Sequence, residues 1–260
     1  MKDRDQDGPL VSLEEVEIRF DDDEPVLRGV DLSVSAGERL LILGQSGSGK
    51  STILRLVTGT LRPTGGTVRF KGDDLAQMGR RRLNRARQRM GMVYQYSALI
   101  SSLSVRDNLA LPLEELTDKS RSEIDEAVRH NLERVGMVEA LDKMPAELSG
   151  GMKKRVGFAR GIMLEPELLL FDEPTAGLDP VMRAVLDELI IDLSEKSGAA
   201  CIVVTHEMES AFRVATRMAM LFEGRIIADD EPARFRDHDD PVVAQFVSGS
   251  TEGPILDAAR

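Results

Sequence analysis

Near its N-terminal end the chain reads Gly44-Gln45-Ser46-Gly47-Ser48-Gly49-Lys50-Ser51-Thr52. This spacing fits G-x-x-x-x-G-K-[ST], in which glycines let the backbone turn tightly so that several N–H groups point at one anion. In that pattern Lys50 binds the β- and γ-phosphates of a nucleotide, and the Ser51 hydroxyl is placed to hold Mg²⁺. The nine residues therefore predict a phosphate-binding loop.

The segments on either side of the loop fit this prediction. Leu40-Leu41-Ile42-Leu43 is a short apolar run, typical of a buried strand. Ile53, Leu54, Leu56 and Val57 lie at helical spacing, and Gly59 is a natural helix end. The phosphates would then lie at a helix N-terminus, where unpaired N–H groups and the helix dipole favour negative charge. The alternative, a Gly/Ser-rich turn that happens to carry a lysine, leaves the flanking strand and helix unexplained.

Composition excludes several classes of protein. The chain has 260 residues, enough for one large domain or a core with an insert, and its formal charge of −11 argues against general nucleic-acid binding. The single cysteine, Cys201, excludes an internal disulfide framework and fits a reducing compartment. The apolar runs are far shorter than the roughly 20 residues that span a bilayer, and residues 1–7 lack the apolar segment of a signal peptide. We expect a cytoplasmic protein that only a partner could hold at a membrane.

Alternating apolar residues predict strands around the loop. The first has Val11, Leu13, Val16, Ile18 and Phe20, with a break at Glu14-Glu15 that fits a bulge. The acidic run 21–24 before Pro25 predicts a turn, and strands follow around residues 32–34 and 67–70. Together these segments predict a small antiparallel β-layer beside the phosphate loop. Phe20, at its edge, either stacks on an adenine face or is an exposed or half-buried core aromatic.

Helical patterns fill much of the middle of the chain. Residues 104–145 are largely helical, with a capping box of Ser120 and Glu123, and predict a helical insert. We interpret a basic run as a solvated helix face rather than a binding surface for single-stranded nucleic acid, because no aromatic residues interleave with it. The run consists of Arg80, Arg81, Arg82, Arg85, Arg87 and Arg89. Two later helices begin at the predicted N-caps Ser149 and Asp179. Their expected apolar faces are Met152, Val156, Ala159 and Met163 in the first helix, and Val181, Val185, Leu189 and Leu193 in the second.

Polar residues follow three further apolar runs, each of which predicts a buried strand. Residues 90–94 end at Gln95, residues 168–171 at Asp172-Glu173, and residues 201–205 at His206. Near-continuous apolar strands are typical of parallel sheets, whose ligands bind beyond the carboxyl ends of the strands. The pattern therefore predicts one site built from distant segments. A hairpin of residues 218–222 and 225–228 closes the sheet.

The candidate roles of these residues follow from phosphate chemistry. Asp172 would hold Mg²⁺, Glu173 would orient and polarise the attacking water, and Gln95 would contact both. His206 would hydrogen-bond the γ-phosphate, while Lys50 stabilises its charge. Each residue also has a plain alternative: a histidine at a strand end is often structural, Asp179 can be only a helix cap, and acidic pairs are common in loops. Their joint occurrence in this order favours the functional interpretation.

The combined motifs resemble the ATPase subunit of an ABC transporter. They are Gly44 to Thr52, Gln95, Leu148-Ser149-Gly150-Gly151, Phe171-Asp172-Glu173, Ala176-Gly177-Leu178-Asp179 and His206, within residues 11–230. The resemblance implies an α/β P-loop NTPase fold with a mostly parallel core sheet, an antiparallel β subdomain and a helical insert at about 96–165. The ATPase domain would span residues 11–231, after a disordered start at 1–10 and before a C-terminal tail at 232–260.

The same resemblance implies a head-to-tail dimer that holds two ATP molecules with Mg²⁺. Ser149, Gly150 and Gly151 of one copy would contact the γ-phosphate bound by the other. Phe20 occupies the adenine-stacking position, and Asp179 lies in the loop that communicates across the dimer. Coupling helices of integral membrane permease subunits would dock near Gln95.

Shorter stretches narrow the resemblance to the phospholipid-transport branch, the ATPases of the Mla and Mce-associated lipid-asymmetry and solvent-tolerance systems. They are residues 148–160, which include Met152 where glutamine is usual, residues 95–99 and residues 246–255. Phe20, where tyrosine is common, is a second departure, and neither removes a catalytic group. This branch implies an ATPase that powers phospholipid transport from the cytoplasmic face of the bacterial inner membrane. Its partners would be a permease, a small regulatory subunit and a lipid-binding protein, with no nucleic acid.

Other functions remain open from the sequence. One is the ATPase subunit of an importer for another small substrate. Another is a soluble ABC-type ATPase acting on chromosomes or ribosomes, although such proteins need a long coiled coil or two cassettes in one chain. A nucleotide switch or kinase would leave Leu148 to Gly151 unexplained.

The end of the chain carries a further apolar pattern. Val242, Val243, Phe246 and Val247 lie at helical spacing, with Gly249 as a stop and Ile255 and Leu256 beyond it. A purely solvated tail has little reason to carry such residues. Our hypothesis is that this tail packs on a neighbouring subunit; the alternative is a helix folded back on its own domain.

Overall fold

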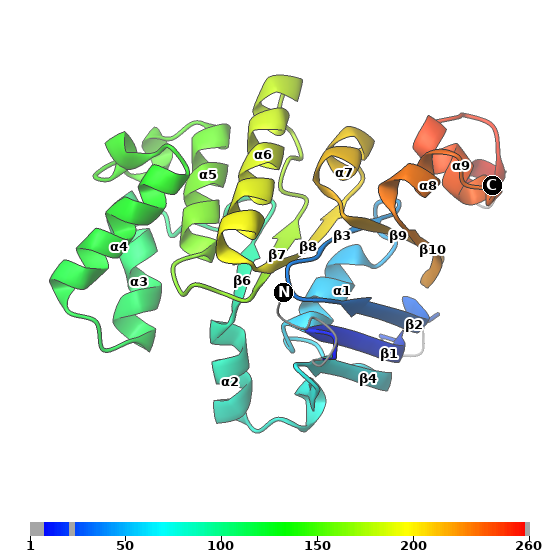
Figure 1. Ribbon diagram of the computed structural model, residues 1–260, viewed down its shortest axis with the longest axis horizontal. Coiled ribbons are helices and arrows are strands. Elements are labelled where there is room, and N and C mark those ends of the chain that lie inside the picture. The colour runs from blue at the N-terminus through cyan, green and yellow to red at the C-terminus, as the bar shows by residue number, and fades with distance from the viewer. Residues whose placement is uncertain (1–7, 21–23, 258–260) are drawn as a thin grey trace, which may run out of the picture. The chain divides into compact units, whose positions relative to one another are not determined.

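The computed structural model describes residues 8–20 and 24–257. Most of the expected disordered start and of the predicted acidic turn lies outside the described residues. The chain forms two compact units (Figure 1): the first runs to Leu83 and resumes at Ala200, and the second is Asn84–Ala199.

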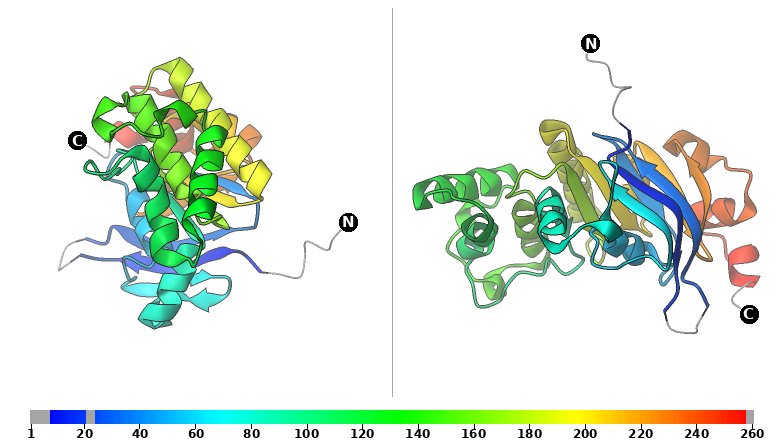
Figure 2. Two further views of the ribbon diagram at one scale, coloured as in Figure 1. Left: turned by 90° about the vertical axis from the view of Figure 1, so that its left-hand side faces the viewer. Right: turned by 90° about the horizontal axis from the view of Figure 1, so that it is seen from below.

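The first unit contains a four-stranded antiparallel sheet, seen from below in the right-hand view of Figure 2. Its strands, in sheet order, are β2 (Leu27–Val34), β1 (Val11–Ile18), β4 (Gly65–Phe70) and β5 (Asp73–Asp74). The predicted antiparallel layer is thus confirmed, and so is the bulge, because the register of β1 shifts between Leu13 and Val16 and Glu15 has a φ of +49°. Phe20 lies beyond the end of β1 with 41% of its surface exposed.

The strand that leads into the phosphate loop also lies in the first unit. It is β3 (Arg39–Leu43), which pairs in parallel with β8 (Ala200–Thr205) and β9 (Arg217–Phe222). The predicted hairpin is confirmed, since β10 (Arg225–Asp230) pairs antiparallel with β9. This part also contains the helical elements α1 (Lys50–Val57), η1 (Leu75–Gln77) and α7 (Met208–Val214). Every residue of β8 is buried, which explains its continuous apolar sequence.

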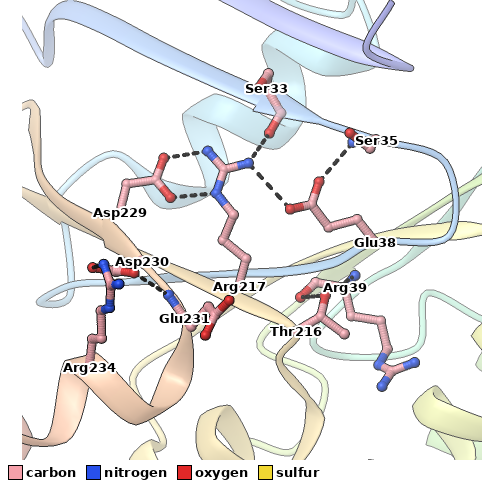
Figure 3. A network of polar contacts seen from close by, with 10 residues as sticks. All are labelled: Ser33, Ser35, Glu38, Arg39, Thr216, Arg217, Asp229, Asp230, Glu231 and Arg234. Carbon is pink, nitrogen blue, oxygen red and sulfur yellow. Dashed lines mark hydrogen bonds and ion pairs between the residues drawn. The ribbon is translucent and has the colours of Figure 1, made fainter. Parts of the chain in front are cut away.

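A guanidinium ties the strands of the first unit together (Figure 3). Arg217 of β9 donates two hydrogen bonds of 2.5 Å to Asp229 of β10, and others to the carbonyl of Ser33 and to Glu38. The hydrogen bonds that Arg217 donates to Asp229 are the main reason why the pKa of Arg217 is raised. Charge-assisted, bidentate bonds of this kind fix geometry as well as stabilise it.

The C-terminal helices belong to the first unit and lie near its β9–β10 hairpin (Figure 1). They are α8 (Pro232–Arg236), α9 (Pro241–Ser248) and α10 (Pro254–Asp257). Val243 is fully buried, and the buried Gln245 accepts a hydrogen bond of 2.8 Å from the backbone of Ile255. Gly249 ends α9 in the left-handed conformation, as expected. These contacts lie within the chain itself and favour the fold-back alternative for the tail.

The second unit combines a parallel strand pair with a group of helices. The pair is β6 (Met90–Val93) and β7 (Leu168–Asp172). The helical elements are α2 (Arg80–Gln88), which starts at the end of the first unit, α3 (Val105–Leu116), α4 (Arg121–Arg134), η2 (Val138–Ala140), η3 (Pro145–Glu147), α5 (Gly150–Gly161) and α6 (Pro180–Ser197). In the left-hand view of Figure 2 the green helices α3 and α4 lie side by side and face the viewer. The capping box of Ser120 and Glu123 is present.

Two sequence-based expectations for this unit are wrong in part. Tyr94 lies beyond β6 and is exposed rather than buried. In α6 the buried apolar residues are Leu186, Ile190 and Leu193, whereas 72% of Val181 is exposed. Residues four apart drift by about 40° at each step around a helix with 3.6 residues per turn. The predicted series of residues four apart lies on the buried face only at its end, Leu193. Towards the start of the helix it has rotated away from that face, so Val181 and Val185 are exposed.

Helix α2 exposes most of its arginines and buries only Ala86, as expected for a solvated face. Within residues 8–20 and 24–257, no helix is long and apolar enough to cross a membrane.

Candidate functional site

The phosphate loop lies between β3 and α1 in the first unit. Gly44, Gly47 and Gly49 have φ angles of +155°, +82° and +103°, which side chains other than glycine's rarely adopt. A Cβ atom on Gly44 would lie 2.4 Å from the carbonyl oxygen of Leu221, so the loop also lacks room for a larger residue there. Gln45, Ser46 and Gly47 are exposed. The backbone is thus a turned, accessible segment at the start of a helix, as an anion site requires.

The side chains of this loop fit a phosphate group. Lys50 is buried, and its ammonium donates hydrogen bonds of 2.8 Å to the carbonyls of Gly44 and Gln45, so the charge lies over the loop itself. The Ser48 hydroxyl is buried and has no hydrogen-bond partner among the described residues. A phosphate oxygen would satisfy such a donor. Ser51 and Thr52 follow Lys50 in the first turn of α1, and Ser51 is exposed.

His206 is the other site residue of the first unit. Leu43 of β3 pairs in parallel register with Thr205 of β8, so Gly44 and His206 follow neighbouring strand ends. The imidazole side chain is 54% exposed and lies 4.0 Å from the Glu207 carboxylate. The structure therefore brings His206 to the strand edge from which the phosphate loop starts.

Gln95 and the acidic pair come together in the second unit. Val93 of β6 pairs with Phe171 of β7, so Gln95 and Asp172-Glu173 follow the same edge of this parallel pair. Glu173 has a φ of +46° directly before Pro174. A residue other than glycine in this conformation costs about 1–3 kcal/mol and persists only where its surroundings impose it. Such strain is common at functional sites.

The loop after Gln95 is also strained and is held by α5. Ser97 and Ala98 have φ angles of +62° and +48°. Arg160 of α5 donates hydrogen bonds to the carbonyls of both residues, at 3.0 and 2.7 Å. Burial lowers the pKa of Arg160. Gly157 faces this loop, where an added Cβ would lie 3.3 Å from the Cβ of Ser97.

The Leu-Ser-Gly-Gly element starts α5. Ser149 is the N-cap and accepts a hydrogen bond of 3.3 Å from the backbone of Met152. Around Gly150 a Cβ would meet nothing within 4 Å, so the backbone at the helix start is open. Asp179 is likewise the N-cap of α6 and accepts from Val181 and Met182. Both predicted caps are confirmed, and both residues keep an exposed position.

Lys154 was missed by the sequence analysis. It is buried in α5, and its ammonium donates hydrogen bonds of 2.7 and 2.8 Å to the carbonyls of Pro174 and Ala176. Burial lowers its pKa to about 8, against the opposite effect of the Glu173 charge. The available signal was its spacing: Lys154 lies four residues before the buried Phe158, on the same face of the helix.

Comparisons with known proteins agree with this geometry. Residues 27–176 match the sequence model of the family described as "ABC transporter". The chain is 38% identical over 230 residues to the "Intermembrane phospholipid transport system ATP-binding protein MlaF" of Escherichia coli (strain K12), covering 88% of this chain and 86% of that protein. It is 40% identical over 226 residues to the "Probable ribonucleotide transport ATP-binding protein mkl" of Mycobacterium leprae (strain TN), covering 87% of this chain and 65% of that protein.

A solved structure extends the comparison to the fold. It is described as "Dimeric structure of a post-hydrolysis state of the ATP-binding cassette MJ0796 bound to ADP and Pi". The TM-score is 0.78 at 29% sequence identity, over 85% of this chain and 98% of that one.

A turned glycine loop at a helix start, a parallel sheet and a Ser-capped Leu-Ser-Gly-Gly helix define an ATP-binding cassette, and the chain belongs to the ABC transporter family. Within that family it is an ATP-hydrolysing transport ATPase, as the cassette relatives indicate. The expected α/β P-loop fold is thereby confirmed.

Proposed function

We propose that this chain works as one of a pair of identical ATPase subunits, at the cytoplasmic face of a membrane, and powers a permease that moves phospholipid. The observation that carries the proposal is the 38% identity over 88% of the chain to a protein named as a phospholipid transport ATP-binding protein. The coarser part, ATP hydrolysis in a transport system, follows from the family. The roles of the individual residues, the pairing with a second copy and the phospholipid substrate belong to the proposal.

In this proposal the phosphate loop holds ATP. The N–H groups of the turned loop and the Lys50 ammonium bind the β- and γ-phosphates, and Phe20 stacks on the adenine. Ser51, Gln95 and Asp172 would hold Mg²⁺, which prefers the hydroxyl, amide and carboxylate oxygens that these residues offer. When bound, the ion neutralises charge that develops on the phosphate oxygens.

Hydrolysis then needs a group that orients water. Glu173 accepts a hydrogen bond from the attacking water and takes up its proton as the water oxygen bonds to the γ-phosphorus. The bond from that phosphorus to the bridging oxygen breaks in the same step, and ADP leaves with this oxygen. His206 donates a hydrogen bond to the γ-phosphate from the end of β8. Gln95 contacts the same water from the end of β6. The strained backbone of Glu173 supports a role that requires one fixed direction for the carboxylate.

A second copy would complete each site. Ser149, Gly150 and Gly151 of one copy contact the γ-phosphate held by the other, and Asp179 lies in the loop that communicates between copies. The open backbone around Gly150 and the exposed Asp179 are compatible with such a contact. The similar cassette solved with ADP and Pi is itself described as dimeric.

The permease would dock beside Gln95. Tyr94, Tyr96 and Ile100 are exposed large hydrophobic residues in this segment, with 85% of Tyr96 accessible. An exposed apolar group of this kind commonly marks an interaction site. A small regulatory subunit and a lipid-binding protein complete the assembly that we expect.

The relative named for ribonucleotide transport supports a second candidate, in which the same ATPase drives an importer for another small substrate. The two candidates share every residue of the ATP site. They differ only in what the permease carries.

The test is to purify the full chain with its membrane partners and reconstitute the complex into liposomes that hold a fluorescent phospholipid. We expect Mg-ATP to drive transfer of the lipid to acceptor vesicles, and Glu173→Gln to abolish it. The same variant should bind ATP, hydrolyse it about 10²–10⁴ times more slowly and accumulate as an ATP-bound dimer in size-exclusion chromatography. Glu165→Gln, at an exposed position before β7, is the matched control.

The outcomes separate the candidates. ATPase stimulation by ribonucleotides, without movement of lipid, would favour the second candidate. Near wild-type turnover in Glu173→Gln, with no ATP-dependent shift in mass, would overturn the role of Glu173.

A further inference from the structure

Helix α5 contacts the chain on both sides of the acidic pair Asp172-Glu173. Before the pair, the ring of Phe158 packs edge-on against Phe171, with 5.1 Å between centroids and 60° between planes. After the pair, the Lys154 ammonium binds the carbonyls of Pro174 and Ala176 at 2.7 and 2.8 Å. Lys154 and Phe158 are one helical turn apart, so a single face of α5 brackets the pair.

The segment that Lys154 holds needs an external support. Glu173 has a φ of +46° although a proline follows it, and Gly177 has a φ of +74°. The turn has its own backbone hydrogen bonds of 3.3 Å from Ala176 to Glu173 and from Leu178 to Thr175. The two bonds from Lys154 are shorter and carry a full charge, so they are the stronger restraint. Pro174 and Thr175 are buried beside them.

A buried lysine is an expensive way to satisfy two carbonyls. Neutral donors could do so without removing a charge from water, and the lowered pKa of Lys154 reflects that cost. The negative charge of Glu173 acts in the opposite direction and favours the ammonium. The two carbonyls of the turn alone do not require a cation. The position of the Lys154 ammonium is therefore better explained by the nearby Glu173 carboxylate, whose charge favours it.

We propose that Lys154 is a positioning residue for ATP hydrolysis: it fixes the direction of the Glu173 carboxylate by holding the turn from Pro174 to Ala176 against α5, the helix that Ser149 caps. The inference rests on the proposed role of Glu173 and deepens it. Because the same helix carries Ser149 at its start, a displacement of α5 is transmitted to the turn that follows Glu173. The Lys154 ammonium binds carbonyls of the turn, so it acts on turnover and leaves ATP binding unchanged.

The test compares Lys154→Met with Lys153→Met in the full-length chain. Methionine keeps most of the length of the lysine side chain and an apolar stem, and it removes the charge and both hydrogen bonds. We expect Lys154→Met to lower kcat about 10-fold or more, since small misplacement of a catalytic group costs up to about 10²-fold. The KM for ATP and the affinity for a fluorescent ATP analogue should change less than about twofold, because uniform binding is untouched. Lys153→Met should match the wild type in all three.

A double-mutant cycle links the effect to Glu173. If Lys154 acts through that carboxylate, Lys154→Met should cost almost nothing further in a Glu173→Gln background, because residues that act as a unit are not additive. Wild-type kcat in Lys154→Met, or losses that multiply in the double variant, would overturn the inference. A Glu173→Gln variant with full turnover would overturn the proposed base instead, and so the two failures are distinguishable.

A variant could also lose activity because it does not fold, and this case is tested separately. Lys154→Gln keeps one donor group near the carbonyls, so it should retain more kcat than Lys154→Met. Circular dichroism at the assay temperature reports whether each variant is folded. If neither variant folds, Lys154 is needed for the fold as such, and the positioning role is overturned.

Discussion

Phe158 and Phe171 meet edge-on in the core of the second unit, and both side chains are fully buried. Phe171 is the residue directly before Asp172, so the packing of α5 on β7 fixes the strand end that carries the acidic pair. Aromatic pairs in this arrangement add about 0.5–1.5 kcal/mol to the burial of their area. The stability of the core and the geometry of the site therefore depend on the same contact.

The first prediction concerns this contact. Phe158→Ala should lower the free energy of unfolding by about 3–5 kcal/mol, because it leaves a cavity in a packed core. Urea unfolding of the full chain measures it. Phe20→Ala removes the same atoms from a side chain that is 41% exposed, and should cost less than about 1 kcal/mol. Equal losses in the two variants would show that the Phe158 ring is not a core element.

The second prediction separates two roles of Ser149. Ser149→Ala removes the N-cap of α5 and should cost about 0.5–2 kcal/mol of stability. Ser149→Arg loses the same cap and adds a bulky charge where the partner's nucleotide would lie. We expect Ser149→Arg alone to abolish ATPase activity, with the affinity of the monomer for a fluorescent ATP analogue unchanged.

The control for Ser149 is Ser120→Ala, which removes the N-cap of α4 outside any motif. It should lose comparable stability and keep its ATPase activity. If Ser149→Arg loses nucleotide affinity as a monomer, the residue is only a cap that its own subunit needs.

Local chemistry accounts for what could be predicted from sequence. The phosphate loop, the caps Ser149 and Asp179 and the hairpin around Gly224 depend on residues a few positions apart, whose preferences are strong. The strand ends that carry the candidate site residues were also predictable, because each is marked in the sequence by the change from an apolar run to a polar residue. The bulge at Glu15 was visible as a break in the alternation of β1.

The missed features depend on contacts between distant segments. Nothing near Lys154 in sequence shows that its ammonium reaches Pro174, 20 positions away. The exposure of Val181 depends on where the core lies around α6, which a four-residue repeat does not define. The sequence left open whether the tail folds back on its own chain, because the burial of Val243 depends on which surface α9 covers.

The third prediction follows from the fold-back of the tail. Ending the chain after Asp240 removes Val243 and Ile255, both buried, each of which contributes about 1.5–3 kcal/mol. The melting temperature should fall by several degrees, at about 2–4 °C for each kcal/mol lost. Differential scanning calorimetry of the isolated full chain and the truncated chain measures the shift.

Matched single variants refine the tail experiment. Val243→Ala should lower the melting temperature more than Val247→Ala, because Val247 is only half-buried. An unchanged melting temperature after truncation would instead favour a tail that packs on a neighbouring subunit.

The last prediction concerns pH and the ammonium of Lys154. Its pKa is lowered from 10.5 to about 8 in the folded chain by burial, with Glu173 opposing the shift. Between pH 8 and 10.5 the unfolded chain therefore holds a proton that the folded chain has released, so this group makes the folded state more stable as pH rises through that window. Below pH 8 both states are protonated, and the contribution of this group to stability does not change with pH.

Relative to Lys154→Met, the wild type should gain stability on the order of 3 kcal/mol between pH 7.5 and 10.5. Urea unfolding across this pH range measures the free energy of unfolding of both proteins. Taking the difference between them cancels the titration of all groups that the two proteins share. Lys153→Met should run parallel to the wild type, and a Lys154→Met curve that did the same would show that the buried ammonium keeps its ordinary pKa.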